Sequence, residues 1–439
     1  MVAASYFAPA PTATTARWLV ATLVAAALLL RLALALVLPY DGGPDERRRY
    51  PVTAQIYATG RTPRYGTETW HHYVVKPMLA YRLNALAAHF VPLALPLYIK
   101  LRLGSVLAGV AAVVAGYAAA RALWPASAGR ALAIAAVLAF YPQLVFLSSY
   151  LNADAYTIAA NALLFWLLAL AIRDGRLRLP LAVGIGGALG LVFLGRENGY
   201  AGFLLAAAAL LPFIAQRRRY RCELLAAAVV ALAFPVLFYA QQQSVYGHAF
   251  LPLLGGSGVA WVPPGWSVAD AFARLPVGGF DYPVFHLIWS NPKHWAIFGA
   301  WLVPSAFGLF GYMDIWLPFH WYALFVLMVG ASVAGWRRLS SLPASLSVGG
   351  VDHRRWLLAG SIVAILTLAA AVLRHNFSVI FQPQGRYLLP LAVPGAVWGV
   401  MGWYSAILGK SRGFWVAFGV SFVIMSGGYS FWKLLTFYG

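Results

Sequence analysis

Acidic residues are scarce in this 439-residue chain, and so is charge of any kind. Aspartate and glutamate together number 12 against 32 lysines and arginines, and only 10% of all residues are charged. Soluble domains usually carry roughly 25% charged residues. With 62% hydrophobic residues and a mean hydropathy of +0.74, the composition excludes a set of soluble globular domains.

The chain also lacks the features of several other protein classes. Its single cysteine, Cys222, excludes an intrachain disulfide framework. Segments that alternate in hydrophobicity with a period of two, as in a membrane β-barrel, are absent. No Walker loop, Rossmann glycine fingerprint or Gly-x-Ser-x-Gly elbow occurs. The net charge of +20 comes mostly from clusters between apolar runs, so we expect membrane lipid and no nucleic acid as a partner.

Long apolar runs are what the chain has instead. Runs of about 17–25 residues, enough for a helix to span a ~30 Å hydrocarbon core, recur along its length. We therefore predict an all-α polytopic membrane protein with about 11 transmembrane helices. The predicted spans are 18–38, 99–121, 131–150, 155–173, 180–195, 198–215, 224–241, 319–336, 356–373, 387–408 and 414–433.

The distribution of basic residues predicts the orientation. The positive-inside rule places arginine-rich short loops in the cytoplasm. Such loops lie at 121–130, 173–178, 217–221, 337–355 and 410–412. The N-terminus is then cytoplasmic, the C-terminus is outside, and nine of the twelve acidic residues face outward. We expect the polar chemistry on the outer face.

Two outer loops are expected on that face, within a single transmembrane domain, 1–439, that has no separate soluble domain. The first, 39–98, contains an apolar segment stopped by Pro92 and Pro96, which is predicted to lie in the membrane interface. The second, 242–318, is rich in glycine, proline and aromatic residues. Its end, 295–318, is broken by Pro304 and Asp314, which indicates a re-entrant or interfacial helix.

Carboxylates next to the first and third predicted spans are candidates for proton transfer. Asp45 and Glu46 follow the first span, where a carboxylate could accept a proton from an acceptor hydroxyl or simply cap the next helix. Asn152 and Asp154 lie at the next outer turn, where they could orient a substrate, bind a metal or cap a helix. Asp41 precedes two glycines and is expected on flexible backbone.

Arginines on the outer side are candidates for binding a lipid phosphate. The arginines at 47–49 follow the acidic pair, and Arg196 and Arg386 border predicted spans at the depth of a lipid phosphate. Guanidinium groups bind phosphate oxygens in a bidentate fashion. Anchoring to lipid headgroups, or a local ion pair between Arg196 and Glu197, would also explain these residues.

Two further features have structural explanations. Arg31 lies in the middle of the first span, where a charge costs about 2.5–3.5 kcal/mol, so it should face the bundle interior. His71 and His72 lack the spacing and the acidic partner that would indicate zinc. The sequence therefore indicates no metal site and no certain cofactor, although the binding of a divalent cation stays an open alternative.

The motifs together resemble a known superfamily. The segment PDERRRYPVTAQIYATGRTP after the first span, a Lys76-Pro77 element, and Asn152-Ala153-Asp154 after a proline-containing third span are similar to the GT-C superfamily. Its members are integral membrane glycosyltransferases that use polyprenyl-phosphate sugars, including protein O-mannosyltransferases and lipid A aminoarabinose transferases. The later segments SAFGLFGYMDIWLP and QGRYLLPLAVP resemble a bacterial branch of unassigned function.

The resemblance implies inverting transfer of a sugar from a polyprenyl-phosphate donor to a hydroxyl group of a glycan or lipid-linked acceptor. It implies an active site on the outer face of a bacterial inner membrane, with Asp45 as the general base. Two alternatives stay open. A lipid-linked oligosaccharide polymerase or ligase would need no carboxylate at Asp45. A lipid or solute transporter would need ionisable residues along a path through the bilayer.

The candidate site has three groups of residues. Candidate catalytic residues are Asp45, Glu46 and Asp154, and candidate ligands of the lipid phosphate are Arg47, Arg48, Arg196 and Arg386. Other candidate substrate contacts are Lys76, Asn152, Gln384 and Tyr387.

Overall fold

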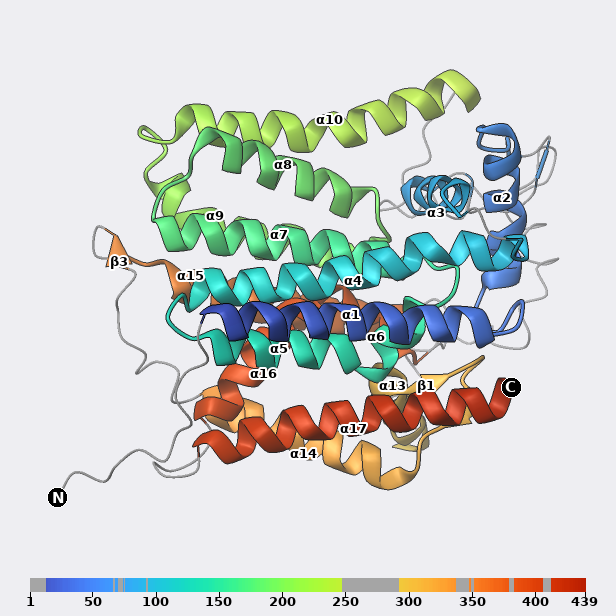
Figure 1. The fold of residues 1–439 in the computed structure, drawn as a ribbon. Coiled ribbons are helices and arrows are strands. Elements are labelled where there is room, and N and C mark those ends of the chain that lie inside the picture. Colours follow the sequence, from blue (N-terminus) through green and yellow to red (C-terminus); the bar gives the residue numbers. More distant parts are fainter. Residues whose placement is uncertain are drawn as a thin grey trace.

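Long helices that run side by side form most of the molecule (Figure 1). The computed structural model describes residues 13–65, 68–69, 74, 76–91, 94–246, 292–336, 347–348, 351–378, 383–405 and 412–439. The long elements are α1 (Ala13–Val37), α4 (Leu97–Leu123), α5 (Ala128–Phe140), α7 (Asp154–Asp174), α8 (Leu179–Phe193), α9 (Ala201–Ala215), α10 (Arg221–Tyr246), α14 (Phe319–Trp336), α15 (His353–Ser378), α16 (Ala392–Ser405) and α17 (Arg412–Tyr438).

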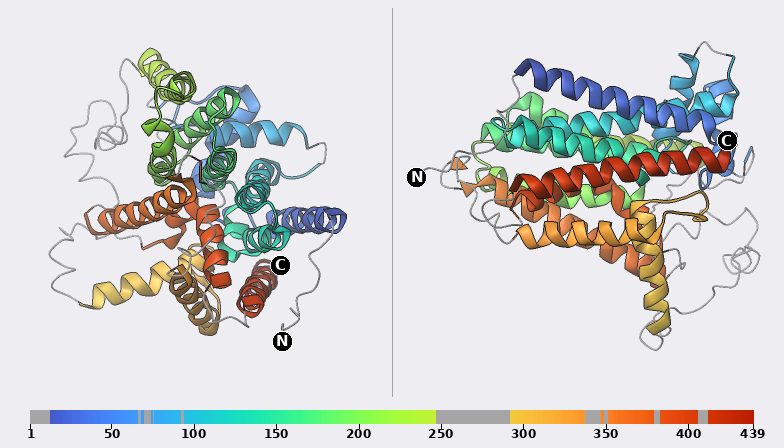
Figure 2. Two further views of the ribbon diagram at one scale, coloured as in Figure 1. Left: turned by 90° about the vertical axis from the view of Figure 1, so that its left-hand side faces the viewer. Right: turned by 60° about the horizontal axis from the view of Figure 1, so that its bottom comes forward.

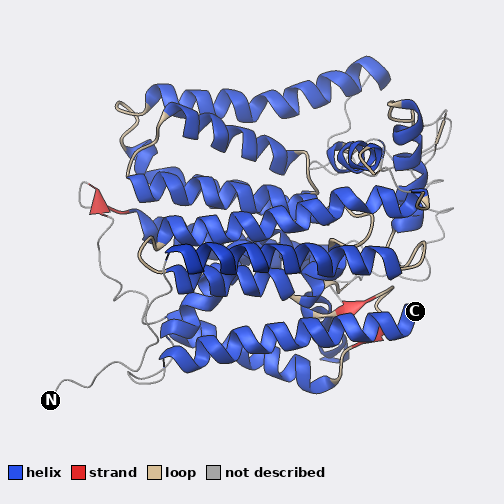
Figure 3. Cartoon of the chain, in the orientation of Figure 1, coloured by secondary structure: helices blue, strands red, loops and turns tan. Residues whose placement is uncertain are grey.

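Shorter elements connect the long helices. They are α2 (Glu46–Thr59), α3 (Leu79–His89), α6 (Pro142–Leu147), the 3-10 helices η2 (Glu197–Tyr200) and η6 (Gly385–Leu391), and α13 (Pro292–Phe307). Figure 3 shows how little strand there is in the described chain. Two hairpins, β1 (Leu309–Phe310) with β2 (Ile315–Trp316) and β3 (Ser347–Val348) with β4 (Val351–Asp352), are antiparallel.

Every predicted span falls on a helix; the span at 198–215 begins in the 3-10 helix η2 before α9 continues it, and two others are interrupted where a proline occurs. The span predicted at 131–150 divides into α5 and α6 because Pro142, at the start of α6, has no N–H to continue the hydrogen-bond ladder. The span predicted at 387–408 begins in the 3-10 helix η6, which contains Pro390, before α16 continues it. Both interruptions lie at the end of the bundle where α2 and α3 are found.

The molecule is a polytopic membrane protein. Seven helices among the described residues are long and apolar enough to cross a bilayer, and Ala128–Phe140, Leu179–Phe193 and Trp295–Phe307 are shorter apolar helices. On α10, large apolar side chains that include Leu225, Leu232 and Leu237 are exposed. Such a surface suits contact with lipid tails rather than water. The number of crossings stays a prediction.

The elements alternate between two ends of the bundle. The predicted outer turns gather at one end, with α2, α3, the β1–β2 hairpin and the C-terminus, whereas the β3–β4 hairpin lies at the other end with the start of α1 (Figure 1). In Figure 1, α2 and α3 lie across the direction of the long helices. Figure 2 shows that α13 also crosses that direction. This geometry agrees with the interfacial or re-entrant helices predicted at 77–98 and 295–318. Most of the large loop, 247–291, lies outside the described residues.

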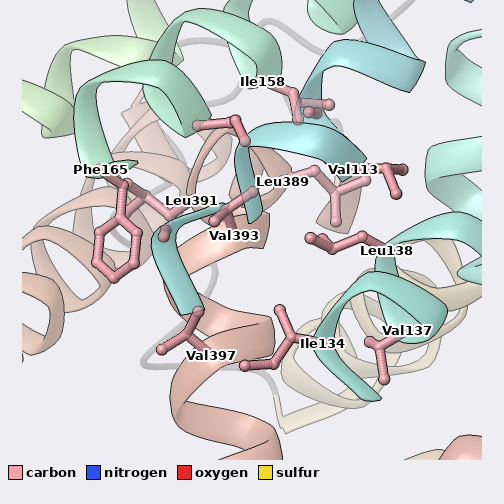
Figure 4. Packing of buried hydrophobic residues seen from close by; sticks show 14 of the residues in the cluster. Val113, Ile134, Val137, Leu138, Ile158, Phe165, Leu389, Leu391, Val393 and Val397 are labelled. Atoms are coloured by element: carbon pink, nitrogen blue, oxygen red, sulfur yellow. The ribbon is translucent and has the colours of Figure 1, made fainter. Parts of the chain in front are cut away.

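The core of the bundle lies between α4, α5, α7 and the segment from η6 into α16. Figure 4 shows Val113, Leu138, Ile158, Leu391 and Val397 meeting there. Close approach depends on small residues, because a Cβ added to Gly116 would lie 2.2 Å from Leu138 Cδ1. This kind of packing is typical of membrane helices.

Arg31 faces the bundle interior, as the sequence predicts. Its side chain is buried and donates to Ser148 Oγ at 2.8 Å, and to the carbonyl oxygens of Ala27 and Ala139 at 3.0 Å and of Leu138 at 3.2 Å. These carbonyls include the last turn of α5, whose ladder is interrupted before Pro142. Arg31 therefore has a structural role in joining α1 to the broken third span.

Candidate active site

A cavity of about 1010 Å³ opens at the end of the bundle that carries the short helices. Its walls come from the first outer loop, the α8–η2 turn, the outer halves of α9 and α15, the turn of the β1–β2 hairpin and the start of η6. Eight residues proposed from sequence line it: Asp45, Arg47, Arg48, Lys76, Arg196, Gln384, Arg386 and Tyr387. Three others, Glu46, Asn152 and Asp154, are buried at 1% exposure and are not among the lining residues.

Asp45 lies at the start of α2 in the left-handed region, with φ 66°. Its side chain makes no capping hydrogen bond, so helix capping does not explain its position. Oδ2 lies 3.3 Å from Arg49 Nη2 and 4.0 Å from Arg386 Nη2, and 30% of the side chain is exposed. A carboxylate held in a strained backbone conformation and open to a cavity is typical of functional sites.

Glu46 has a different environment from Asp45. Its carboxylate forms a buried bidentate pair with Arg102 of α4, at 2.7 Å from Nε and 2.6 Å from Nη2, and also accepts the backbone N–H of Leu151 at 3.1 Å. Arg102 donates further to the carbonyls of Ala35, Leu38 and Pro39 at the end of α1. Glu46 therefore ties α2 to α1 and α4, and this geometry favours a structural role over a catalytic one.

Asp154 is also engaged in a buried ion pair. Both of its carboxylate oxygens accept from Arg196 Nη1, at 2.8 and 2.9 Å. Asn152 Oδ1 accepts the backbone N–H of Asp154 at 3.0 Å and Arg49 Nη1 at 2.9 Å. Asn152 thus performs the capping that the sequence left open for either residue, while Asp154 positions Arg196.

Arg196 belongs to both the ion pair and the cavity wall. Burial alone would lower the pKa of its guanidinium, but the neighbouring Asp154 carboxylate raises this pKa above its ordinary value. The side chain is 30% exposed, so part of the cation is open to the cavity. The local pair with Glu197 considered from sequence is not formed. Glu197 lies 3.2 Å from Lys76 Nζ, and both of these side chains line the cavity.

Arg386 is a buried cation with few protein partners. Its side chain is 6% exposed, Nη1 is 3.5 Å from Tyr150 Oη, and Nε has no hydrogen-bond partner. The guanidinium also lies 5.5 Å from the ring centroid of Tyr387, and that of Arg196 lies 5.7 Å from the same ring. Arginine stays charged in proteins. A buried guanidinium whose Nε has no hydrogen-bond partner therefore favours the binding of an anionic ligand.

Asp41 is fixed by hydrogen bonds, contrary to the flexible backbone expected before two glycines. Its Oδ1 accepts from Tyr312 Oη at 2.6 Å and from the backbone N–H of Arg47 at 3.0 Å. Gly43 is packed rather than loose, because a Cβ there would lie 2.2 Å from the Tyr150 ring. The side chains of Arg47 and Arg48 are exposed at the cavity.

Sequence reasoning missed Arg102, Tyr150 and Tyr312. For Arg102 a signal existed, since an arginine inside a predicted span requires a buried partner. The two tyrosines carry no sequence signal, because only the fold brings them beside Arg386 and Asp41. Within the described ranges, no group of three or more His, Cys, Asp or Glu side chains could hold a metal ion. His71 and His72 lie outside those ranges.

The sequence matches no protein-family model, and no curated protein matches it. Solved structures do. ArnT from Cupriavidus metallidurans, bound to undecaprenyl phosphate, matches with a TM-score of 0.54 and 17% identity over 93% of this chain and 63% of that one. The oligosaccharyltransferase AglB from Archaeoglobus fulgidus, in complex with an inhibitory peptide and a dolichol-phosphate, matches with a TM-score of 0.52 and 16% identity, over 95% and 55%.

The chain thus spans less than two thirds of the length of these two proteins. The two matches nevertheless cover 93% and 95% of this chain. The resemblance seen in the sequence motifs is therefore confirmed at the level of the fold. This chain has the fold of the GT-C integral membrane glycosyltransferases.

Proposed function

We propose that this protein is a membrane glycosyltransferase that takes a sugar from a polyprenyl-phosphate donor. One observation carries the proposal: the partly exposed carboxylate of Asp45 and the buried guanidinium of Arg386, whose Nε has no hydrogen-bond partner, share a cavity, with 4.0 Å between Oδ2 and Nη2. A base for an acceptor hydroxyl and a cation for a leaving phosphate are the two groups that this transfer needs. The fold shared with ArnT and AglB supports it.

The cavity wall is polar at one part and apolar at another, as a lipid phosphate requires. Arg196, Arg386 and Lys76 supply cations. Leu204 on α9 and Leu368 and Val372 on α15 supply an apolar surface below them. We propose that the phosphate binds to the cations while the polyprenyl tail follows this surface into the bilayer. ArnT and AglB, solved with undecaprenyl phosphate and with a dolichol-phosphate, bind such lipids.

The proposed reaction is a single displacement at the anomeric carbon. Asp45 Oδ2 accepts the proton of the acceptor hydroxyl, and the oxygen forms a bond to the anomeric carbon. The bond from that carbon to the phosphate oxygen breaks, and its electron pair leaves with the polyprenyl phosphate. Arg386 and Arg196 stabilise the negative charge on this leaving group. Attack opposite the leaving group inverts the anomeric configuration. A hydroxyl of a glycan or lipid-linked acceptor is the proposed nucleophile.

The proposal includes a location. We place the cavity on the outer face of a bacterial inner membrane, with the N-terminus in the cytoplasm, because the arginine-rich loops at 121–130, 173–178 and 217–221 lie at the other end of the bundle. Polyprenyl-phosphate sugars presented on that face would then reach the cavity from within the lipid layer.

The direct test is incubation of the purified protein with undecaprenyl phosphate carrying glucose, mannose, galactose or arabinose. Release of undecaprenyl phosphate that depends on the protein and on the attached sugar would support the proposal. Failure to bind any of these donors, or bare undecaprenyl phosphate, would overturn it.

A further inference from the structure

Two amide side chains at the cavity have oxygen atoms without partners. Asn198 and Gln384 both line the cavity, and Asn198 Oδ1 and Gln384 Oε1 are buried without a hydrogen bond. Buried acceptors are almost always satisfied in folded proteins, so each exception calls for an explanation. Neither residue takes part in the proton transfer or the charge stabilisation described above.

Both amides lie next to the cations proposed to hold the phosphate. Asn198 follows Arg196 by two residues in η2, and Gln384 precedes Arg386 by two residues at the start of η6. Asn198 Nδ2 donates to the carbonyl oxygen of Tyr387 at 3.4 Å, which joins the two segments and leaves the Asn198 oxygen as the available acceptor. The same wall of the cavity thus carries two cations and two acceptor oxygens.

The backbone around Gln384 is held firmly, so its unsatisfied oxygen does not reflect loose packing. Ser305 Oγ accepts the N–H of Gly385 at 2.7 Å and donates to the carbonyl oxygen of Trp301 in α13 at 2.6 Å. A Cβ at Gly385 would lie 2.1 Å from the carbonyl oxygen of Leu302. The terminal torsion of the amide is soft, so the oxygen can reorient while the backbone stays in place.

We propose that Asn198 and Gln384 form the subsite that recognises the transferred sugar, an inference that rests on the proposed function. The anomeric carbon is bonded to the phosphate, so a sugar whose phosphate contacts Arg196 and Arg386 has its ring beside these amides. Carbonyl oxygens of amides only accept hydrogen bonds. The subsite therefore selects a sugar that presents free hydroxyl or amino hydrogens at two positions, and it discriminates against deoxy, fluoro and acylated forms.

The test compares sugar-bearing and bare lipid phosphate. Gln384→Met keeps the side-chain length and removes the acceptor oxygen. It is expected to weaken binding of the preferred undecaprenyl-phosphate sugar by roughly 10- to 100-fold, while binding of bare undecaprenyl phosphate stays unchanged. Asn198→Leu also removes the Nδ2 donor to the Tyr387 carbonyl oxygen, so it should weaken binding of the sugar-bearing donor at least as much and binding of the bare lipid by a smaller factor. Gln241→Met, at an exposed position on α10 away from the cavity, is the matched control and should alter neither.

Modified donors complete the experiment. The wild-type protein should bind a donor that lacks the recognised hydroxyl more weakly than the intact donor, by a similar factor. The variant that lacks the amide recognising this hydroxyl should bind the modified donor and the intact donor with equal affinity. Variants that weaken bare undecaprenyl phosphate as much as the sugar-bearing donor would overturn the inference, since the amides would then only support the arginines. Variants that bind both ligands like wild type would also overturn it. Wild-type protein that binds neither ligand would instead overturn the proposed function.

Discussion

At the scale of single residues, the two adjacent acids of the first outer loop have opposite environments. Asp45 is open to the cavity, and Glu46 is enclosed against Arg102 at 2.6 Å. Asp45 takes a left-handed conformation, with φ 66°, directly before α2 begins at Glu46. The two neighbouring carboxylates therefore differ in role: that of Asp45 is open to the cavity, and that of Glu46 holds α2 against α1 and α4.

Replacement of Asp45 tests the proposed general base. Asp45→Asn preserves shape, so it should fold and bind a polyprenyl-phosphate sugar normally while transfer falls by about 10²–10⁴-fold. Asp41→Asn should lose less, because Asp41 accepts from Tyr312 and Arg47 without facing the reaction. Turnover with saturating donor measures the effect. Near-normal transfer by Asp45→Asn, together with dependence on Arg386, would favour a polymerase or ligase.

Glu46→Gln should give a different result from Asp45→Asn. It leaves the buried Arg102 guanidinium without its charge partner, and breaking a buried pair typically costs about 3–5 kcal/mol. The measured change should therefore be a lower unfolding temperature rather than a selective loss of transfer.

Replacement of Arg386 tests the phosphate site. Arg386→Ala should weaken binding of undecaprenyl phosphate by roughly 10- to 150-fold, since hydrogen bonds to charged groups contribute about 1.5–3 kcal/mol. Arg386→Lys retains the charge and should lose less. Arg196→Ala should have a smaller effect on binding, because that side chain is already paired with Asp154. A folded Arg386→Ala protein with unchanged affinity would leave Arg386 as an interface anchor.

At the scale of elements, irregular segments carry the site. The first outer loop, the α8–η2 turn and η6 are each positioned by a contact with a neighbouring helix: Arg102 of α4, Asp154 of α7 and Ser305 of α13. Hydropathy predicts the regular helices because lipid burial depends on composition along the chain. It does not predict that Pro142 and Pro390 divide two spans, or that Arg31 donates to the carbonyl oxygens of Leu138 and Ala139 before Pro142.

Gly385 offers a test of how η6 holds its side chains. In Gly385→Ala the new Cβ would lie 2.1 Å from the Leu302 carbonyl oxygen, so η6 must move away from α13. We expect weaker binding of undecaprenyl phosphate and a lower unfolding temperature. Gly395→Ala is the control, because nothing lies within 4 Å of a Cβ there and α16 should gain up to about 1 kcal/mol. Equal behaviour of the two variants would show that η6 does not depend on this contact.

At the scale of the whole molecule, the chain brings its predicted outer turns to one end of the bundle and the arginine-rich loops at 121–130, 173–178 and 217–221 to the other. This separation follows from spans and loop charges, so the sequence predicts that Asp45, Arg196 and Arg386 share one end. The individual pairings do not follow. Which arginine meets which acid depends on how each helix is rotated about its axis, and Arg102–Glu46 and Arg196–Asp154 join residues 56 and 42 positions apart.

The orientation of the molecule in the membrane can be tested with its own cysteine. Cys222, the only cysteine in the sequence, is exposed at the start of α10, beside the basic cluster at 217–221 that the positive-inside rule places in the cytoplasm. A membrane-impermeant maleimide should therefore not react with it from the outer face, and should react once the membrane is permeabilised. In a Cys222→Ser protein, a cysteine introduced at Thr67 should be labelled from outside without permeabilisation. Labelling of Cys222 in sealed membranes would invert the topology, and the cavity, with Asp45 and Arg386, would then open to the cytoplasm.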